Sequence, residues 1–226
     1  MGYNNDSLLG PLVFDIETTA LSNAADYLEP VQAARNLKDP EKVRADLEQR
    51  TAERDSKLAL DWNVGRIAVI AWWTAEHGVV ILPCADERLE AEALEQFWLA
   101  AKQRVLVGFN VKQFDLRFLV QRSRYLGVPY PPLDLGRYGR GEIRDLYAEL
   151  TFNEPQAGEA CMRRTLSAFA KRFGLAVPET CSSADIPVLV ADGHWEPVLA
   201  HVRADVELTL ALARRLGVVQ PETVPA

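Results

Sequence analysis

Hydrophobic and polar positions along the chain follow two periods, one typical of strands and one typical of helices. Apolar, β-branched runs predict strands over 11–18, 65–74, 78–82 and 105–108. Apolar residues at helical spacing and helix start and stop signals predict helices over 89–102, 114–125, 165–173, 185–190 and 194–216, with another beginning at Leu146. The second and third strands are close enough in sequence to form a hairpin beside the first. This order predicts one α/β domain over residues 1–226, with a mixed β-sheet flanked by helices.

A helix expected between the first and second strands differs from the others. Residues 39–41 (Asp-Pro-Glu) provide an N-cap acid, a proline at the first helical position and an acid in the first turn. Residues 42–57 contain no glycine or proline, so the helix is expected to run to about Leu58. Its apolar positions are sparse, which predicts a mostly solvent-exposed helix. We therefore interpret residues from about 30 to 60 as a helical insertion that lies over the core.

The composition is that of an ordinary globular protein. Of the 226 residues, 48% are hydrophobic and 25% are charged. No apolar run is long enough to span a membrane, and the N-terminal residues lack the basic-then-apolar pattern of a signal peptide. Cys84, Cys161 and Cys181 are widely spaced and odd in number, so we expect reduced thiols in a cytoplasmic protein.

The net charge of −7 restricts the nucleic-acid functions that are compatible with the chain. Proteins that bind duplex DNA electrostatically need clustered basic residues, so the charge argues against that class. It does not exclude an enzyme that acts on one chain end, because bound cations offset acidic side chains locally. Some basic residues do cluster, and solvated helix faces explain such clusters more often than ligand binding does. The clusters are Arg137, Arg140 and Arg144, and Arg163, Arg164, Lys171 and Arg172.

The first predicted strand ends in two carboxylates, Asp15 and Glu17. Residues two apart in a strand project from the same face, so these side chains are expected to lie side by side. Like charges at that spacing repel each other, and a divalent cation such as Mg²⁺ relieves the repulsion because it takes carboxylate oxygens as ligands. The alternative is an exposed strand end with two solvated acids. Further carboxylates elsewhere in the chain would favour the metal site.

Two more acids stand at positions that suit a ligand site. Asp115 lies at the start of a helix that follows a buried strand, although the helix dipole alone also favours an acid there. Asp205 lies within the last helix, with His201 one turn before it on the same face. Apolar residues further along that face indicate that it points inward, where an aspartate needs a partner or a metal. His201 by itself would be interpreted as a partly buried structural histidine.

Three segments that carry these residues resemble the exonuclease motifs of the DEDD superfamily: residues 15–18 (DIET), 108–115 (GFNVKQFD) and 201–209 (HVRADVELT). That superfamily has a ribonuclease H-like fold and includes the proofreading domains of DNA polymerases. The whole chain is similar to predicted 3′–5′ exonucleases related to the exonuclease domain of family B polymerases. Residues 38–42 (KDPEK) and 59–67 (ALDWNVGRI) also resemble that group. The resemblance implies a ribonuclease H-like mixed β-sheet.

The resemblance also implies an activity, which is hydrolysis of phosphodiester bonds from the 3′ end of nucleic acid, with single-stranded DNA as the expected substrate and nucleoside 5′-monophosphates as products. Two divalent ions, Mg²⁺ or Mn²⁺, would be the cofactors. Asp15, Glu17 and Asp205 would hold one ion, Asp15 would bridge to the second, and Asp115 would help through water. His201 would position or deprotonate the attacking water. Candidate substrate contacts are Asn110, Phe114, Lys112, Arg137, Arg140 and Arg163, although Phe114 is equally suited to the core.

One position departs from the superfamily pattern. The superfamily divides by its third motif into Tyr-x3-Asp and His-x4-Asp forms, and here a histidine stands at the tyrosine-type spacing. Whether His201 acts as a base or only orients water is therefore open.

The expected partners are nucleic acid with a free 3′ end and a polymerase or other replication or repair protein, and no membrane. The alternative is a catalytically silent nucleic-acid-binding or polymerase-docking protein with the same fold. In a docking protein, the exposed helix over 39–58 would be the candidate surface.

Overall fold

The fold is built around a five-stranded mixed β-sheet with the strand order β3-β2-β1-β4-β5. The computed structural model describes residues 9–136, 143–152 and 165–220. The central strand β1 pairs antiparallel with β2 and parallel with β4. The strands are β1 (Leu9–Ala20), β2 (Gly65–Thr74), β3 (Gly78–Pro83), β4 (Arg104–Gly108) and β5 (Ile143–Asp145). The expected α/β class with a mixed sheet and flanking helices is confirmed.

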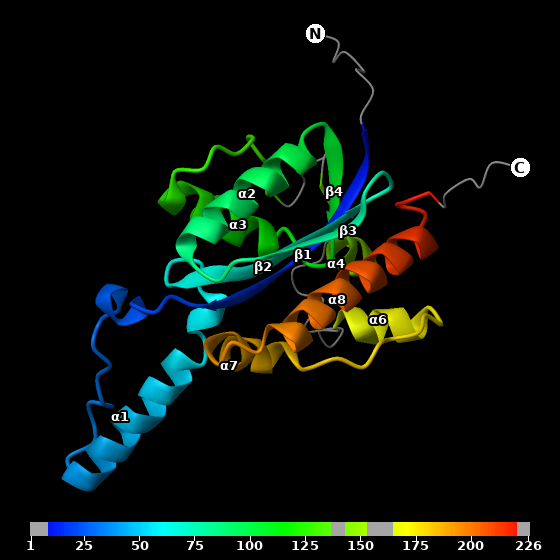
Figure 1. Cartoon of the computed structure of the whole chain (residues 1–226). Helices are drawn as coiled ribbons and strands as arrows, with labels where there is room; N and C mark the ends of the chain where they lie inside the picture. The colour runs from blue at the N-terminus through cyan, green and yellow to red at the C-terminus, as the bar shows by residue number, and fades with distance from the viewer. Residues whose placement is uncertain (1–8, 137–142, 153–164, 221–226) are drawn as a thin grey trace, which may run out of the picture.

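Helices cover both faces of this sheet (Figure 1). α2 (Glu87–Ala101) and α3 (Asp115–Leu126) lie on one face. α7 (Ile186–Ala191) and α8 (Trp195–Arg215) lie on the other, where α8 packs against β1 and β2. The sheet therefore has a separate hydrophobic core on each side.

The alternation of side chains along β1 determines which residues face α8. Leu12, Phe14 and Ile16 belong to the core under α2 and α3, whereas Val13 belongs to the core under α8. With a period of two residues, Asp15 and Glu17 project from the same face as Val13. The two carboxylates therefore lie on the side of the sheet that α8 covers.

Local signals at the ends of the helices agree with the structure. The side chains of Asp39, Asp86, Asp145 and Thr165 each accept a backbone N–H at the start of the helix that they precede. The other short helices among the described residues are η1 (Ala24–Tyr27), η2 (Leu58–Leu60), α4 (Leu146–Leu150), α6 (Leu166–Arg172) and η3 (Ser183–Asp185). The strand β5 was not predicted, because three residues are too few to carry a periodic pattern, and its pairing with β4 is a long-range contact.

The helix α1 (Pro40–Asp55) projects away from the sheet (Figure 1), and none of its residues is buried. The predicted N-cap at Asp39 and the solvent exposure are confirmed, but the expectation that this helix lies over the core is wrong. It lacks an apolar stripe wide enough to pack on the sheet. Instead, Asp46 Oδ2 accepts a hydrogen bond from the Ala34 N–H at 2.8 Å, which joins α1 to the segment before it.

Two expectations from composition concern the cysteines and the membrane. Cys84 and Cys181 are free thiols, and Cys161 lies outside the described residues. Among the helices that the structure describes, none is both long and apolar enough to cross a membrane.

Candidate active site

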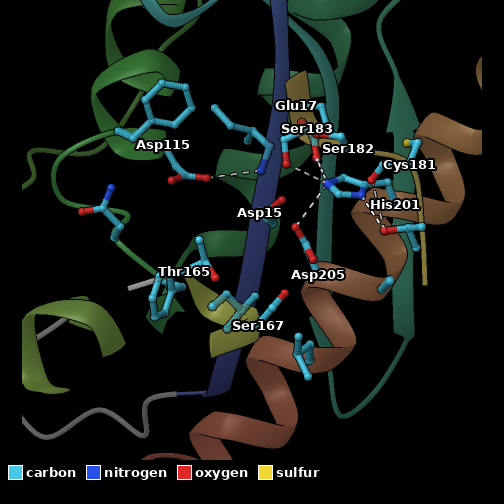
Figure 2. Close-up of a pocket in the computed structure, with 18 of the residues that line it drawn as sticks. Asp15, Glu17, Asp115, Thr165, Ser167, Cys181, Ser182, Ser183, His201 and Asp205 are labelled. Carbon is cyan, nitrogen blue, oxygen red and sulfur yellow. Dashed lines mark hydrogen bonds and ion pairs between the residues drawn. The ribbon is translucent and has the colours of Figure 1, made fainter. Parts of the chain in front are cut away.

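Asp15 and Glu17, in the C-terminal half of β1, line a cavity of about 1170 Å³ (Figure 2). The pairing of β1 with β2 is irregular at this point: Glu17 pairs with Val69 and Thr18 pairs with Ile67, which leaves an extra residue on β2. Such bulges are common beside functional sites, where they change the direction of a side chain. The N–H of Ile67 is satisfied by the buried carboxylate of Glu90 at 2.9 Å.

Asp115 enters the same cavity from the first turn of α3. Its Oδ1 atom accepts a hydrogen bond from the backbone N–H of Ile16 at 3.2 Å, and its side chain is buried. Because Ile16 lies between Asp15 and Glu17, this bond holds the third carboxylate beside the first two.

Asp145 supports the loop that leads into α3. Its Oδ1 accepts the N–H of Asn110 at 2.9 Å, and its Oδ2 accepts the N–H of Lys112 at 3.0 Å. Asn110 has a left-handed backbone, with φ of 63°, so the loop needs such support. The same carboxylate also caps α4 through Tyr147 and Ala148. The sequence indicated only the capping role, because contacts 33 and 35 residues away leave no local pattern.

The long helix α8 places Asp205 and His201 on the face that looks toward β1 (Figure 2). The Nε2 atom of His201 lies 3.4 Å from Glu17 Oε1 and 3.5 Å from Asp205 Oδ2. Glu17, His201 and Asp205 each offer one ligand atom, and these atoms lie within 4.8 Å of one another. Three segments that are far apart in the sequence therefore converge in one cavity.

A loop before α7 holds the imidazole of His201. Thr180 Oγ1 lies 2.8 Å from Nδ1, and Ser183 Oγ lies 3.1 Å from Nε2. The sequence pattern predicts neither residue, because hydroxyl residues in a loop are common and nothing local links them to a helix that follows. The structure alone shows that both ring nitrogens have hydroxyl partners.

The four carboxylates destabilise one another's charged forms. Burial raises the pKa of Asp15 well above its usual value, and the charges of Asp115, Asp205 and Glu17 raise it further. Burial also raises the pKa of Glu17, with contributions from Asp205 and Asp115. Burial raises the pKa of Asp205, and His201 opposes that shift. These shifts indicate a site that needs added positive charge.

Asp115 also has a raised pKa. Burial raises its pKa to about 7, although hydrogen bonds from backbone N–H groups, including that of Ile16, oppose the increase. Among the described residues that line the cavity, His201 is the only one with a basic side chain. Carboxylate oxygens without nearby Lys or Arg are the environment that a divalent cation fits. The residues present are therefore compatible with a metal site.

The predicted substrate contacts have different outcomes. Asn110 and Phe114 line the cavity. Phe114 also packs on Phe118, with ring centroids 5.1 Å apart, so its side chain contributes both to the cavity wall and to hydrophobic packing. Lys112 is buried and is not among the described residues that line the cavity. The remaining predicted contacts, Arg137, Arg140 and Arg163, lie outside the described residues.

Aromatic residues that the sequence pattern does not mark as site residues form another part of the cavity wall. Phe109 and Tyr147 line the cavity, with ring centroids 5.4 Å apart in an edge-to-face arrangement. Phe169 packs against both rings, with centroids 6.0 and 6.3 Å away. The cavity thus combines acidic groups with flat apolar side chains.

Comparison with known proteins adds a structural similarity. No protein-family model matches the chain, and no curated protein matches it. The structure of the family B DNA polymerase from the hyperthermophilic archaeon Pyrobaculum calidifontis is similar, with a TM-score of 0.57 and 21% sequence identity. The shared region covers 93% of this chain and 24% of the polymerase chain, so this chain spans about a quarter of the polymerase's length. The similarity establishes the fold. The ribonuclease H-like mixed β-sheet expected from the sequence is confirmed.

Proposed function

We propose that this chain is a metal-dependent 3′–5′ exonuclease of the DEDD type, acting on single-stranded DNA and releasing nucleoside 5′-monophosphates. One observation carries the proposal: four carboxylates from β1, α3 and α8 share one cavity and raise one another's pKa. The resemblance of the same three segments to exonuclease motifs supports it, as does the structural similarity to a family B DNA polymerase.

In this proposal Asp15, Glu17 and Asp205 would hold one divalent ion, Mg²⁺ or Mn²⁺. As the resemblance to exonuclease motifs implies, Asp15 would also bind a second ion, and Asp115 would contribute through water. When bound, the two ions would stabilise the attacking and leaving oxygens of the phosphodiester. The protein's part is to keep the carboxylates in place, which the bond from Ile16 to Asp115 and the loop support from Asp145 achieve.

The other wall of the cavity suits an unpaired base. Phe109, Phe114 and Tyr147 offer aromatic surfaces, and stacking on such surfaces is tolerant of base identity. Asn110 offers an amide beside them. A net charge of −7 and a cavity wall with one basic side chain among its described residues do not suit a duplex-binding surface. These features favour an enzyme that takes a single unpaired end.

The test is cleavage of 5′-labelled single-stranded DNA with Mg²⁺ or Mn²⁺. We expect a ladder of successively shorter products that requires metal and disappears in Asp15→Asn. Asp192→Asn is the matched control, because Asp192 is an exposed carboxylate outside the cavity. Shortening from the 5′ end, or unchanged activity in Asp15→Asn, would contradict the proposal.

The same assay separates the catalytically silent alternative. A protein that binds single strands but leaves them intact with every divalent ion would be a binding protein with this fold. Running RNA of the same sequence in parallel determines which nucleic acid is preferred.

A polymerase or another replication or repair protein is the proposed protein partner, and α1 is the surface available to it because none of its residues is buried. Deleting residues 38–57 should leave oligonucleotide shortening unchanged and abolish binding to the polymerase of the same source in a pull-down. Equal binding by both forms would place the contact elsewhere.

A further inference from the structure

Thr180 lies beside one ring nitrogen of His201, where its hydroxyl can accept a hydrogen bond. The hydroxyl of Thr180 donates to the carbonyl of Cys181 at 3.4 Å, which leaves its oxygen as the acceptor for a ring N–H. That oxygen lies 2.8 Å from Nδ1 of His201, so it can accept a hydrogen bond from Nδ1–H when Nε2 is bound to a cation. In that tautomer the other nitrogen, Nε2, presents a lone pair.

That lone pair faces two carboxylate oxygens, and the side chains around it are largely buried. Nε2 lies 3.4 Å from Glu17 Oε1 and 3.5 Å from Asp205 Oδ2, and the side chains of His201 and Glu17 are only 8% and 10% exposed. The hydroxyl of Ser183, 3.1 Å from Nε2, can donate one hydrogen to it. Even with this hydrogen bond, the carboxylates of Glu17 and Asp205 are directed at the same point. Their mutual repulsion is unfavourable without a cation between them.

The spacing of these atoms suits direct coordination. A metal with bonds of 2.0–2.2 Å to nitrogen and oxygen in tetrahedral geometry has ligand atoms separated by about 3.4 Å. Octahedral Mg²⁺, with bonds of 2.0–2.1 Å, needs neighbouring ligands about 2.9 Å apart. The two distances from Nε2 are close to the tetrahedral value, and all three ligand atoms lie within 4.8 Å of one another.

We propose that His201 is itself a metal ligand through Nε2, and that Glu17, His201 and Asp205 bind a first-row transition ion such as Zn²⁺ in preference to Mg²⁺. The proposal rests on the metal site of the proposed function and names the class of ion that this site takes. Imidazole is a ligand of transition ions, whereas Mg²⁺ takes oxygen ligands. Thr180 supplies the outer partner that a ligating histidine usually has, because it accepts the Nδ1–H bond.

The role that this assigns to His201 differs from that of a base. A nitrogen bound to metal has no free lone pair with which to take a proton from water. His201 therefore determines which ion is held and does not serve as the base.

The test uses the full chain loaded with Mn²⁺ and pulsed electron paramagnetic resonance, which detects nitrogen bound to the ion. We expect nitrogen modulation in the wild-type protein and its loss in His201→Gln, which keeps similar volume. His194→Gln is the matched control, because His194 is an exposed histidine at the start of the same helix, and it should retain the signal. Absence of nitrogen modulation in the wild-type protein, or its persistence in His201→Gln, overturns the proposal.

Calorimetric titration with Zn²⁺ and Mg²⁺ provides a second measurement that does not depend on removing His201. Thr180→Val should weaken Zn²⁺ binding about 10- to 100-fold, because it removes the partner of Nδ1. Ser183→Ala removes the competing hydroxyl at Nε2, so it should leave Zn²⁺ binding equal or tighter. Weaker Zn²⁺ binding in Ser183→Ala with no change in Thr180→Val would contradict the proposed tautomer.

Failure of this proposal can be told apart from failure of the proposed function. If Mn²⁺ binds without nitrogen modulation and single strands are still shortened, His201 is not a ligand but the exonuclease stands. If neither metal binding nor shortening is found, both proposals are wrong.

Discussion

The backbone N–H of Ile16 donates a hydrogen bond to Asp115 Oδ1 at 3.2 Å, which joins the first turn of α3 to β1. Ile16 stands between Asp15 and Glu17, so the bond positions the third carboxylate relative to the first two. It connects residues 99 positions apart, and it needs an oxygen acceptor but not a negative charge. The geometric and electrostatic roles of Asp115 can therefore be separated by substitution.

Asp115→Asn should abolish nucleic-acid cleavage while leaving the fold intact. Its amide oxygen can still accept the Ile16 N–H, but the charge proposed to act on a metal is gone. Asp115→Ala loses the acceptor as well and should lower the free energy of unfolding by about 1–3 kcal/mol. Urea unfolding and the oligonucleotide assay measure the two effects. Wild-type cleavage by Asp115→Asn would remove this residue from the proposed site.

The stability of the metal-free protein should fall as pH rises from about 4 to about 7. Asp115 has its pKa raised from 3.8 to about 7 in the folded state, so the folded state binds more protons than the unfolded state across this range. The stabilisation is complete below pH 3.8 and is lost as pH passes 7. The contribution of Asp115 to the free energy of unfolding is of the order of 4 kcal/mol.

Thermal unfolding of wild-type protein and Asp115→Asn at each pH, both with a chelator, measures this contribution as a difference. The asparagine variant should lack the part that comes from Asp115. A divalent ion should reduce the loss in the wild-type protein, because it stabilises the charged carboxylates. Parallel curves for the two proteins would show that Asp115 does not titrate in this range.

Asp145 is expected to be a positioning residue for the loop before α3. Asp145→Asn keeps one oxygen but replaces the acceptor of the Lys112 N–H, and should lower the free energy of unfolding by about 1–3 kcal/mol. Asp145→Ala loses four accepted bonds and should cost more. We expect kcat to fall more than KM rises, with partial recovery in the asparagine variant. Equal kcat in the wild-type protein, Asp145→Asn and Asp145→Ala would show that Asp145 contributes to stability but does not position catalytic groups.

A buried ion pair supports β2 beside the bulge. Arg122 and Glu90, whose side chains are 2% and 0% exposed, are joined by Nε–Oε1 and guanidinium–Oε2 contacts of 2.8 Å. Arg122→Met should destabilise the protein by about 3–5 kcal/mol, because it leaves the Glu90 charge buried without this partner. Adding Glu90→Gln should recover much of the loss, since glutamine can still accept the Ile67 N–H.

Urea unfolding of the wild-type, single and double variants forms a double-mutant cycle that measures this coupling. The coupling should be large because the two side chains touch. Additive effects would show that each residue contributes independently of the other.

Much of the candidate site was predictable because it depends on local periodicity. Asp15 and Glu17 share a face of β1 since they are two residues apart, and His201 and Asp205 share a face of α8 since they are four apart. The capping acids Asp39 and Asp145 are likewise explained by the few residues that follow each. Patterns within such short windows follow from backbone geometry and need no information about the rest of the chain.

The tertiary structure alone decided how these faces meet. The packing of α8 against β1 brings His201 to Glu17, and the loop before α7 places Thr180 and Ser183 on the two ring nitrogens. Asp145 reaches the loop before α3 only because β5 pairs with β4. Each of these contacts joins segments far apart in the sequence, and it depends on the packing of helices on a sheet, which no local period encodes. The sequence by itself therefore determined which residues share a face, and packing determined the environment of His201.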